Sequence, residues 1–324
     1  MSSEQAAAVQ DGYVPVIDVG LAGPSSPARR KAVAQAVASA YQTSGFFVAV
    51  GHGVSAQTVT AMHTETGRFF RQDRAVKDRV RSDPLDPLQR GYTPSERLEM
   101  FSASPLGERA ASGHPLFVPN RWPDLPGFRD AYLAYQAAME SVGQAIMRLC
   151  ALALGLPEDW FDAKFARHMS PLTANYYPAR PEAGPGARLR NEPHSDLNVL
   201  TLLSQDDSPG GLQVQDRGGR WADVPPVPGS FVVNLGQLMT IWTNDHWQST
   251  VHRVVNPPPE HRHGDRISIA FFYQPSPDTI IECLPTCATS GQPARHAPVT
   301  AGQYLVAKAR RAYLRQRTQS GSHG

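Results

Sequence analysis

The chain has 324 residues and a nearly balanced charge, with a formal net charge of +2 at pH 7. This length allows a substantial core in one large domain or two lobes, and the charge gives no sign of a nucleic-acid-binding surface. The three cysteines, Cys150, Cys283 and Cys287, are too few for a disulfide framework, which predicts a reducing, cytoplasmic setting. No apolar run reaches membrane-spanning length, and the N-terminus lacks the pattern of a signal peptide.

The first half of the chain mixes strand and helix patterns. Residues 1–12 predict a disordered lead-in, and the proline-rich residues 82–126 predict a long loop of the kind that is often functional. The regular elements predicted here, in chain order, are a strand at 13–19, a helix at 28–44, a strand at 46–50, a helix at 55–70 and a helix at 128–154.

Strand patterns dominate the second half. Strands are predicted at 173–177, 199–204, 212–215, 221–224, 231–234, 250–256 and 267–273. Short strands separated by Gly/Pro turns predict a β-sandwich or a jelly roll. A short helix at 235–242 interrupts the series, a last helix at 301–316 is expected over the barrel mouth, and the tail 320–324 is expected to be disordered. The predicted fold class is α+β: a double-stranded β-helix (jelly roll) core flanked by N-terminal and C-terminal helices.

Two histidines and one aspartate form the main candidate site. His194 and Asp196 are two apart in an extended stretch, so their side chains share a face. His252 lies in a second strand-like run. Two His and one carboxylate with open positions opposite are the facial triad of non-haem Fe(II) oxygenases, although the donors alone do not exclude Mn(II), Co(II) or Zn(II). The competing interpretation is a jelly roll that binds no metal.

A further pair, Arg266 and Ser268, shares one face of the next predicted strand. A guanidinium fork beside a hydroxyl suits a carboxylate. A lone arginine in a strand is more often a solvated edge residue, so this interpretation depends on the triad that precedes it.

These motifs together resemble the iron- and 2-oxoglutarate-dependent dioxygenases of the isopenicillin N synthase-like family. The resemblance covers most of the chain. It is carried by Val14-Pro15-Val16-Ile17-Asp18, Gly45-Phe46-Phe47, Asn175-Tyr176-Tyr177-Pro178, His194-Ser195-Asp196, Leu200-Thr201-Leu202-Leu203, Gly210-Gly211-Leu212-Gln213-Val214, Val232-Val233-Asn234-Leu235-Gly236, Trp242-Thr243-Asn244, Ser249-Thr250-Val251-His252-Arg253-Val254 and Arg266-Ile267-Ser268.

The resemblance implies roles for individual residues. His194, Asp196 and His252 would bind Fe(II), and Arg266, Ser268, Asn175 and Tyr177 would hold 2-oxoglutarate, with O2 as the oxidant. The substrate side chains it suggests are Phe272, Thr173 and Tyr92, for which core packing is the competing interpretation. Gln237 stands where the family commonly has an acidic residue, and nothing in the expected chemistry depends on it. Specificity is expected in 102–116, which departs from the family pattern.

The expected activity is the oxidation of a small specialised metabolite, by hydroxylation, desaturation or cyclisation, with release of succinate and CO2. Specialised metabolism of this kind includes antibiotic biosynthesis. Two alternatives stay open from the sequence: an Fe(II) oxidase that uses no 2-oxoglutarate, and a non-catalytic jelly-roll binding protein. No nucleic-acid or membrane partner is expected. The oligomeric state is not determined, and a monomer is compatible with the sequence.

The expected organisation has four parts. Residues 12–126 form an N-terminal dioxygenase region with a substrate loop, 127–165 a backing helix, 166–290 the jelly-roll core that holds iron and 2-oxoglutarate, and 291–324 a C-terminal helix and tail.

Overall fold

The computed structural model describes residues 8–10, 13–23, 25–108, 116–181, 187–206, 208, 211–224, 226–288 and 291–320. The expected disordered segments fall largely outside these residues, namely at 1–7, 11–12 and 321–324. The expectation is wrong at Ala8–Gln10, which forms strand β1 and pairs antiparallel with the next strand.

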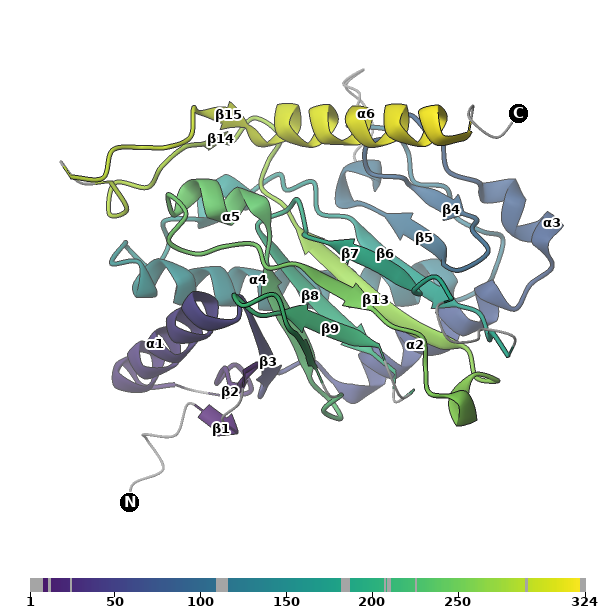
Figure 1. Ribbon diagram of the computed structural model, residues 1–324, viewed down its shortest axis with the longest axis horizontal. Coiled ribbons are helices and arrows are strands. Elements are labelled where there is room, and N and C mark those ends of the chain that lie inside the picture. The colour runs from purple at the N-terminus through teal and green to yellow at the C-terminus, as the bar shows by residue number, and fades with distance from the viewer. Residues whose placement is uncertain are drawn as a thin grey trace.

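Two facing β-sheets form the core (Figure 1). The larger sheet has nine strands in the order β1-β2-β3-β11-β8-β13-β6-β5-β4, and the smaller has four in the order β10-β9-β12-β7. The bounds of the large sheet are β1 (Ala8–Gln10), β2 (Val16–Asp18), β3 (Phe46–Val50), β4 (Gly91–Thr93), β5 (Glu99–Ala103), β6 (Leu172–Tyr177), β8 (Leu200–Gln205), β11 (Phe231–Leu235) and β13 (Arg266–Tyr273). Those of the small sheet are β7 (Asn191–His194), β9 (Leu212–Gln215), β10 (Trp221–Asp223) and β12 (His252–Val254).

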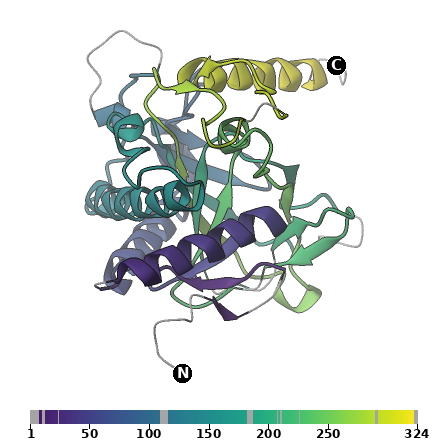
Figure 2. The ribbon, with the colours of Figure 1, turned by 90° about the vertical axis from the view of Figure 1, so that its left-hand side faces the viewer.

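Helices cover the outer face of the large sheet (Figure 2). The helices are α1 (Pro27–Thr43), α2 (Ala56–Phe70), α3 (Arg74–Lys77), α4 (Phe128–Ala153), α5 (Gln237–Trp242) and α6 (Ala301–Ser320), with short 3-10 turns at Asp78–Val80, Pro105–Glu108, Asp162–Phe165 and Pro259–His261. The apolar side of α4 is buried between α1, α2 and the sheet. Ser26 and Ser55 cap α1 and α2 by accepting hydrogen bonds from backbone amides three residues on.

The two faces of strand β13 have different surroundings: one faces the apolar core under the helices and the other faces the space between the two sheets. Its odd-numbered residues, from Ile267 to Tyr273, belong to the apolar core under the helices. Because side chains alternate along a strand, its even-numbered residues, from Arg266 to Phe272, face the small sheet. A smaller apolar cluster, which includes Val232 of the large sheet and Val214 of the small one, fills the space between the sheets beside them.

The predicted loop 82–126 is partly wrong, because it contains β4 and β5. Strand β5 pairs antiparallel with β6, and β4 pairs with β5, so both extend the large sheet. The prolines flank these strands rather than interrupt them. The turn before β4 is fixed by the buried Arg90, whose guanidinium binds both carboxylate oxygens of Asp86 and the carbonyls of Leu116 and Val118.

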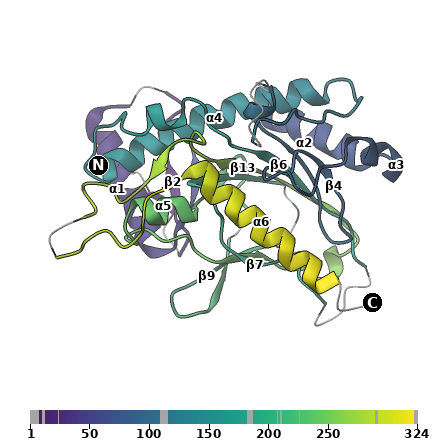
Figure 3. The same ribbon diagram turned by 90° about the horizontal axis from the view of Figure 1, so that it is seen from above.

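The C-terminal helix α6 crosses one end of the two sheets (Figure 3). A two-stranded hairpin, β14 (Ile280–Ile281) with β15 (Val299–Thr300), leads into it. None of the helices within the described ranges is long and apolar enough to cross a membrane.

Candidate metal and cosubstrate site

The structure brings His194, Asp196 and His252 together between the two sheets. His194 and His252 are direct cross-strand partners on β7 and β12, and their ring centroids lie 4.3 Å apart. Asp196 follows β7, and its Oδ1 lies 3.7 Å from His252 Nε2 and 4.0 Å from His194 Nε2. One donor atom from each residue falls within 4.8 Å of the other two. Antiparallel pairing of two short strands therefore creates the cluster that the sequence predicts.

Hydrogen bonds orient the donor atoms toward one point. His194 Nδ1 lies 2.8 Å from the carbonyl oxygen of Glu192, and His252 Nδ1 lies 3.1 Å from that of Thr250. A carbonyl only accepts, so each Nδ1 carries the proton and each Nε2 keeps a free lone pair. This is the tautomer that a metal requires.

Asp196 is held by two donors that the sequence did not single out. Its Oδ2 accepts hydrogen bonds from Thr201 Oγ1 at 2.6 Å and Asn234 Nδ2 at 2.7 Å, which leaves Oδ1 to face the imidazoles. Thr201 and Asn234 are cross-strand partners on β8 and β11. Their roles depend on strand register, and both lie in stretches noted only for their family resemblance.

The electrostatics favour the forms that bind a metal. Burial raises the pKa of Asp196, but the imidazoles of His252 and His194 and the hydrogen bonds from Thr201 and Asn234 outweigh it, so the net pKa lies below its ordinary value. Burial lowers the pKa of His252, against the opposing charge of Asp196. The carboxylate is therefore ionised and His252 neutral at pH 7, as a ligand set requires.

The four residues predicted to hold the cosubstrate share the inner face of the large sheet. Arg266 pairs across strands with Tyr177, and Ser268 pairs with Asn175. Direct cross-strand partners point the same way, so all four side chains face the small sheet. Burial raises the pKa of Tyr177, while the charge of Arg266 and a hydrogen bond with Ser268 oppose the rise.

Arg266 has an unused hydrogen-bonding group in the interior. The residue is 2% exposed, and its Nη2 donates to Gln205 Oε1 at 2.8 Å. Its Nη1 is buried without a hydrogen-bond partner in the described part of the chain. An unpaired buried guanidinium nitrogen is costly, so an acceptor is expected to bind it. A carboxylate beside the Ser268 hydroxyl fits that requirement.

A cavity of about 240 Å³ opens beside His194 and Asp196. Thr173 and Phe272, two of the three residues suggested for substrate contact, line it. Tyr92, the third residue suggested for substrate contact, does not line the cavity, so that expectation is wrong. Tyr92 is fully buried in the aromatic core, where its hydroxyl donates to Glu99 Oε2 at 2.5 Å and its ring packs on Phe69.

Gln237 joins the C-terminal helix to the stretch that carries the triad. Its Nε2 donates to Ser195 Oγ at 2.9 Å, and its Oε1 accepts from Tyr304 Oη at 2.5 Å and Lys308 Nζ at 3.0 Å. Its backbone N–H also donates to the carbonyl of Asp196. The sequence assigned Gln237 no role, but it fixes α6 over the cavity, where Leu305 forms part of the wall.

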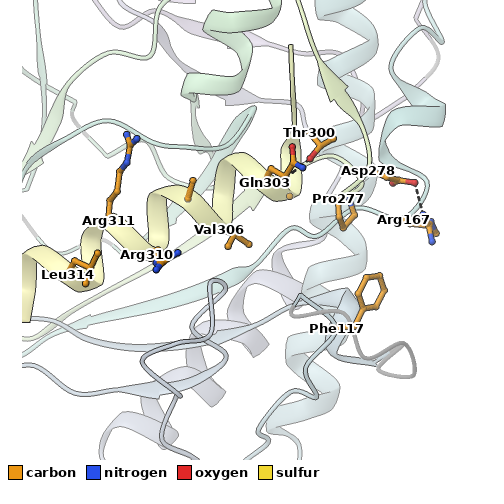
Figure 4. Close-up of a pocket in the computed structure, with 12 residues that line it drawn as sticks. Phe117, Arg167, Pro277, Asp278, Thr300, Gln303, Val306, Arg310, Arg311 and Leu314 are labelled. Atoms are coloured by element: carbon orange, nitrogen blue, oxygen red, sulfur yellow. Dashed lines mark hydrogen bonds and ion pairs between the residues drawn. The ribbon is translucent and has the colours of Figure 1, made fainter. Parts of the chain in front are cut away.

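A larger groove, of about 1120 Å³, lies on the other side of α6 (Figure 4). Val306 and Arg310 of α6 line it together with Phe117 and the Arg167–Asp278 ion pair. None of the triad residues lines this groove.

Fold and site together define a jelly-roll protein with a two-histidine, one-carboxylate centre. Residues 169–275 match the model of the 2OG-Fe(II) oxygenase superfamily, and residues 14–125 match the model described as non-haem dioxygenase in morphine synthesis N-terminal. A 2-oxoglutarate-Fe(II) type oxidoreductase of Aspergillus fumigatus is 33% identical over 90% of this chain and 91% of its own length. The chain therefore belongs to the 2-oxoglutarate- and Fe(II)-dependent oxygenases.

Two further relatives agree with this assignment. Validamycin A dioxygenase of Streptomyces hygroscopicus subsp. limoneus is 29% identical over 92% of this chain and 86% of its own length. The crystal structure of a full-length Neurospora crassa protein in complex with alpha-KG and thymine superimposes with a TM-score of 0.84 at 27% identity, covering 95% of this chain and 100% of that one. The predicted fold class, family, enzyme class and cofactors, Fe(II), 2-oxoglutarate and O2, are confirmed. The comparisons favour this function over the oxidase and the non-catalytic binding protein.

Proposed function

We propose that His194, Asp196 and His252 hold the Fe(II), and that Arg266 and Ser268, with Asn175 and Tyr177, hold 2-oxoglutarate. The enzyme oxidises a small metabolite seated against Thr173 and Phe272, and hydroxylation is the proposed outcome. Desaturation or cyclisation would use the same centre with a different placement of the substrate.

The observation that carries this proposal is the buried, unpaired Nη1 of Arg266. Arg266 lies on the same inner sheet face as Thr201, the residue that donates a hydrogen bond to Asp196. The chain contributes the metal-donor atoms of His194, Asp196 and His252 on one side and the incompletely hydrogen-bonded guanidinium of Arg266 on the other. A 2-oxo dicarboxylic acid has the two functions needed to join them, a chelating 2-oxo acid end and a free carboxylate.

The residues of this chain do three things in the reaction. Glu192 and Thr250 fix the imidazole tautomers through their carbonyls, while Thr201 and Asn234 keep one oxygen of Asp196 occupied. Arg266 and Ser268 orient the distal carboxylate, and the walls of the cavity limit the access of water. The chemistry supplied by Fe(II), 2-oxoglutarate and O2, when bound, is oxidation of a C–H bond with release of succinate and CO2.

The cavity supports an uncharged, polar substrate. Its described lining is carboxamides and hydroxyls between apolar walls, and apart from the triad residues it carries no charge: Pro87, Leu88, Gln89, Ser102, Pro171, Thr173, His194, Ser195, Asp196, Leu197, Asn198, Phe272, Gln274 and Leu305. Ser102 and Thr173 already share a hydrogen bond of 3.0 Å. A carboxylate substrate would find no cation in this lining to offset its desolvation. Thymine, the ligand named in the Neurospora crassa complex, belongs to the uncharged polar class that the lining suits.

The remaining features of the enzyme are also proposals. We infer that it works in the cytoplasm without a nucleic-acid or membrane partner, as the balanced charge and the three unpaired cysteines support, and a monomer is compatible with the sequence. We propose four parts, at 12–126, 127–165, 166–290 and 291–324, and strands of the first and third parts share one sheet. Size-exclusion chromatography with light scattering tests the monomer.

Anaerobic titration of 2-oxoglutarate into the Fe(II)-loaded protein tests the proposed function. The expected result is the weak visible charge-transfer band of the chelate, followed by succinate formation in air with a panel of uncharged polar metabolites. Arg266→Ala should raise the 2-oxoglutarate requirement far more than it alters Fe(II) affinity. Absence of the band in iron-replete wild-type protein would refute the cosubstrate assignment, and full turnover by His194→Ala or Asp196→Ala would refute the metal assignment.

A further inference from the structure

A second buried arginine lies near Arg266. Arg190 immediately precedes β7, the strand that ends at His194, and it is only 2% exposed. Its Nη2 donates a long hydrogen bond, 3.3 Å, to the carbonyl of Gly264. Its Nε is buried and has no hydrogen-bond partner among the described residues. One long bond to a carbonyl is weak compensation for a buried guanidinium, which carries five donors.

Arg190 and Arg266 approach the same tyrosine from the two sheets. The guanidinium carbon of Arg266 lies 5.1 Å from the centroid of the Tyr177 ring, and that of Arg190 lies 5.8 Å from it. Within the described part of the chain, neither arginine forms an ion pair with a carboxylate. Asp206 acts on Arg190 only through its charge at longer range.

The two buried cations repel each other. Burial, followed by the charge of Arg266, lowers the pKa of Arg190 to about 10, so both groups still carry their charge at pH 7. A buried pair of like charges is costly unless an anion joins them, and the cost falls when that anion accepts hydrogen bonds from both. Each arginine keeps a buried nitrogen without a partner for this purpose.

We propose that Arg190 is a second positioning residue for the distal carboxylate of the 2-oxo acid, and that it strengthens the binding of dicarboxylic relative to monocarboxylic 2-oxo acids. The inference rests on the proposed function, which already assigns Arg266 and Ser268 to that carboxylate. It adds a residue from the opposite sheet, so that the carboxylate bridges β13 and the start of β7.

The test compares two ligands that differ in the distal carboxylate. Fe(II)-loaded, full-length protein is titrated anaerobically with 2-oxoglutarate or with 2-oxopentanoate, which chelates through the same 2-oxo acid group but ends in a methyl. Dissociation constants come from the visible band and from calorimetry, so no turnover is needed. The variants are Arg190→Gln, Arg190→Lys and the control Arg188→Gln, whose side chain is 73% exposed two residues earlier.

The expected result is specific to the dicarboxylate. A hydrogen bond to a charged partner supports a weakening of 2-oxoglutarate binding by about 10- to 100-fold in Arg190→Gln, with 2-oxopentanoate changed less than about twofold. Arg190→Lys keeps the charge, so its dissociation constant for 2-oxoglutarate should lie between those of the wild type and Arg190→Gln. The dissociation constants of Arg188→Gln should match those of the wild type. Should Arg190→Gln fail to fold, the lysine variant decides by the same ratio of the two dissociation constants.

Two other outcomes have separate meanings. If Arg190→Gln, or the lysine variant in its place, weakens both ligands equally or neither, Arg190 only braces the Gly264 turn and the inference is overturned. If the wild type itself binds 2-oxopentanoate as tightly as 2-oxoglutarate, no distal carboxylate site exists and the proposed cosubstrate role of Arg266 fails as well.

Discussion

Thr201 offers a sharp test of how the metal centre is built. Its hydroxyl donates to Asp196 Oδ2 at 2.6 Å, and Thr201 and Asp196 are both buried. Thr201→Val removes this donor, keeps the volume of the side chain and retains a β-branched residue in strand β8. Thr201→Ser is the matched control, because it keeps the hydroxyl and loses only the methyl.

The expected loss of Fe(II) affinity follows from the strength of the hydrogen bond between Thr201 and Asp196. A hydrogen bond to a charged group contributes about 1.5–3 kcal/mol, but the metal-free carboxylate also uses it, so only part appears in metal affinity. Loss of such an outer partner weakens metal binding by roughly 10- to 100-fold, or about 1.4–2.8 kcal/mol. The lower end is expected for Thr201→Val, since Asn234 still holds the same oxygen at 2.7 Å.

The assay is an anaerobic Fe(II) titration against a competing chelator, with thermal melting of the metal-free proteins as a check on folding. Thr201→Val should bind Fe(II) about tenfold more weakly, and Thr201→Ser should stay within about threefold of the wild type. If the valine variant binds as tightly as the wild type, or the serine variant as weakly as the valine variant, the hydroxyl does not position Asp196.

Three further predictions concern the surroundings of the centre. The pKa of His252 is lowered by burial from 6.5, so the unfolded chain binds the proton more readily, and stability is lost as pH falls from about 6.5 through the folded-state pKa; His252→Gln should flatten the decline in melting temperature of the metal-free protein between pH about 7.5 and about 5.5, and equal slopes would contradict this. Arg90→Met should destabilise the protein by about 3–5 kcal/mol in chemical denaturation, because it leaves the buried Asp86 carboxylate without its partner at 2.7 Å; Arg74→Met, in an exposed pair with Asp78, is the control and should change little. Gln237→Leu should speed amide hydrogen exchange in α6, because Tyr304 and Lys308 lose their acceptor; Gln303→Leu, on the groove side of the same helix, should leave exchange unchanged, and a similar rise in both variants would rule out a specific role for Gln237.

The sequence predicted those parts of the molecule that depend on local pattern. The helices predicted at 28–44, 55–70 and 128–154 and the shared face of Arg266 and Ser268 each depend on neighbours in the chain, and the structure has all of them. The His194–Asp196 spacing and the Arg266–Ser268 spacing are also local, which is why they could be recognised. The structure brings both pairs to the space between the sheets.

The features that the sequence did not predict depend on which strands pair. Thr201 and Asn234 meet Asp196 only because β8 and β11 are neighbours in register. Arg190 approaches Tyr177 across the gap between the sheets, a contact with no signature in either stretch. Strands β4 and β5 were hidden by flanking prolines, and Tyr92, taken for a pocket residue, is directed into the core by the same pairing.

Strand β13 contributes one face to the apolar core and the other to the proposed cosubstrate site, and this limits how its sequence can vary. The face of β13 that holds Ile267, Ile269 and Phe271 is sealed under the helices, so the register of the strand is fixed by the core. A slip of one residue would bury Arg266 and Ser268 in that core and expose the isoleucines to the site. The backbone positions of Arg266 and Ser268 are therefore set by the packing behind the strand, and Gln205 adds a hydrogen bond to the Arg266 guanidinium. The site residues from β7, β12 and the stretch after β7 lack such a backing, which accounts for the hydrogen bonds that Glu192, Thr250, Thr201, Asn234 and Gln237 direct to this region.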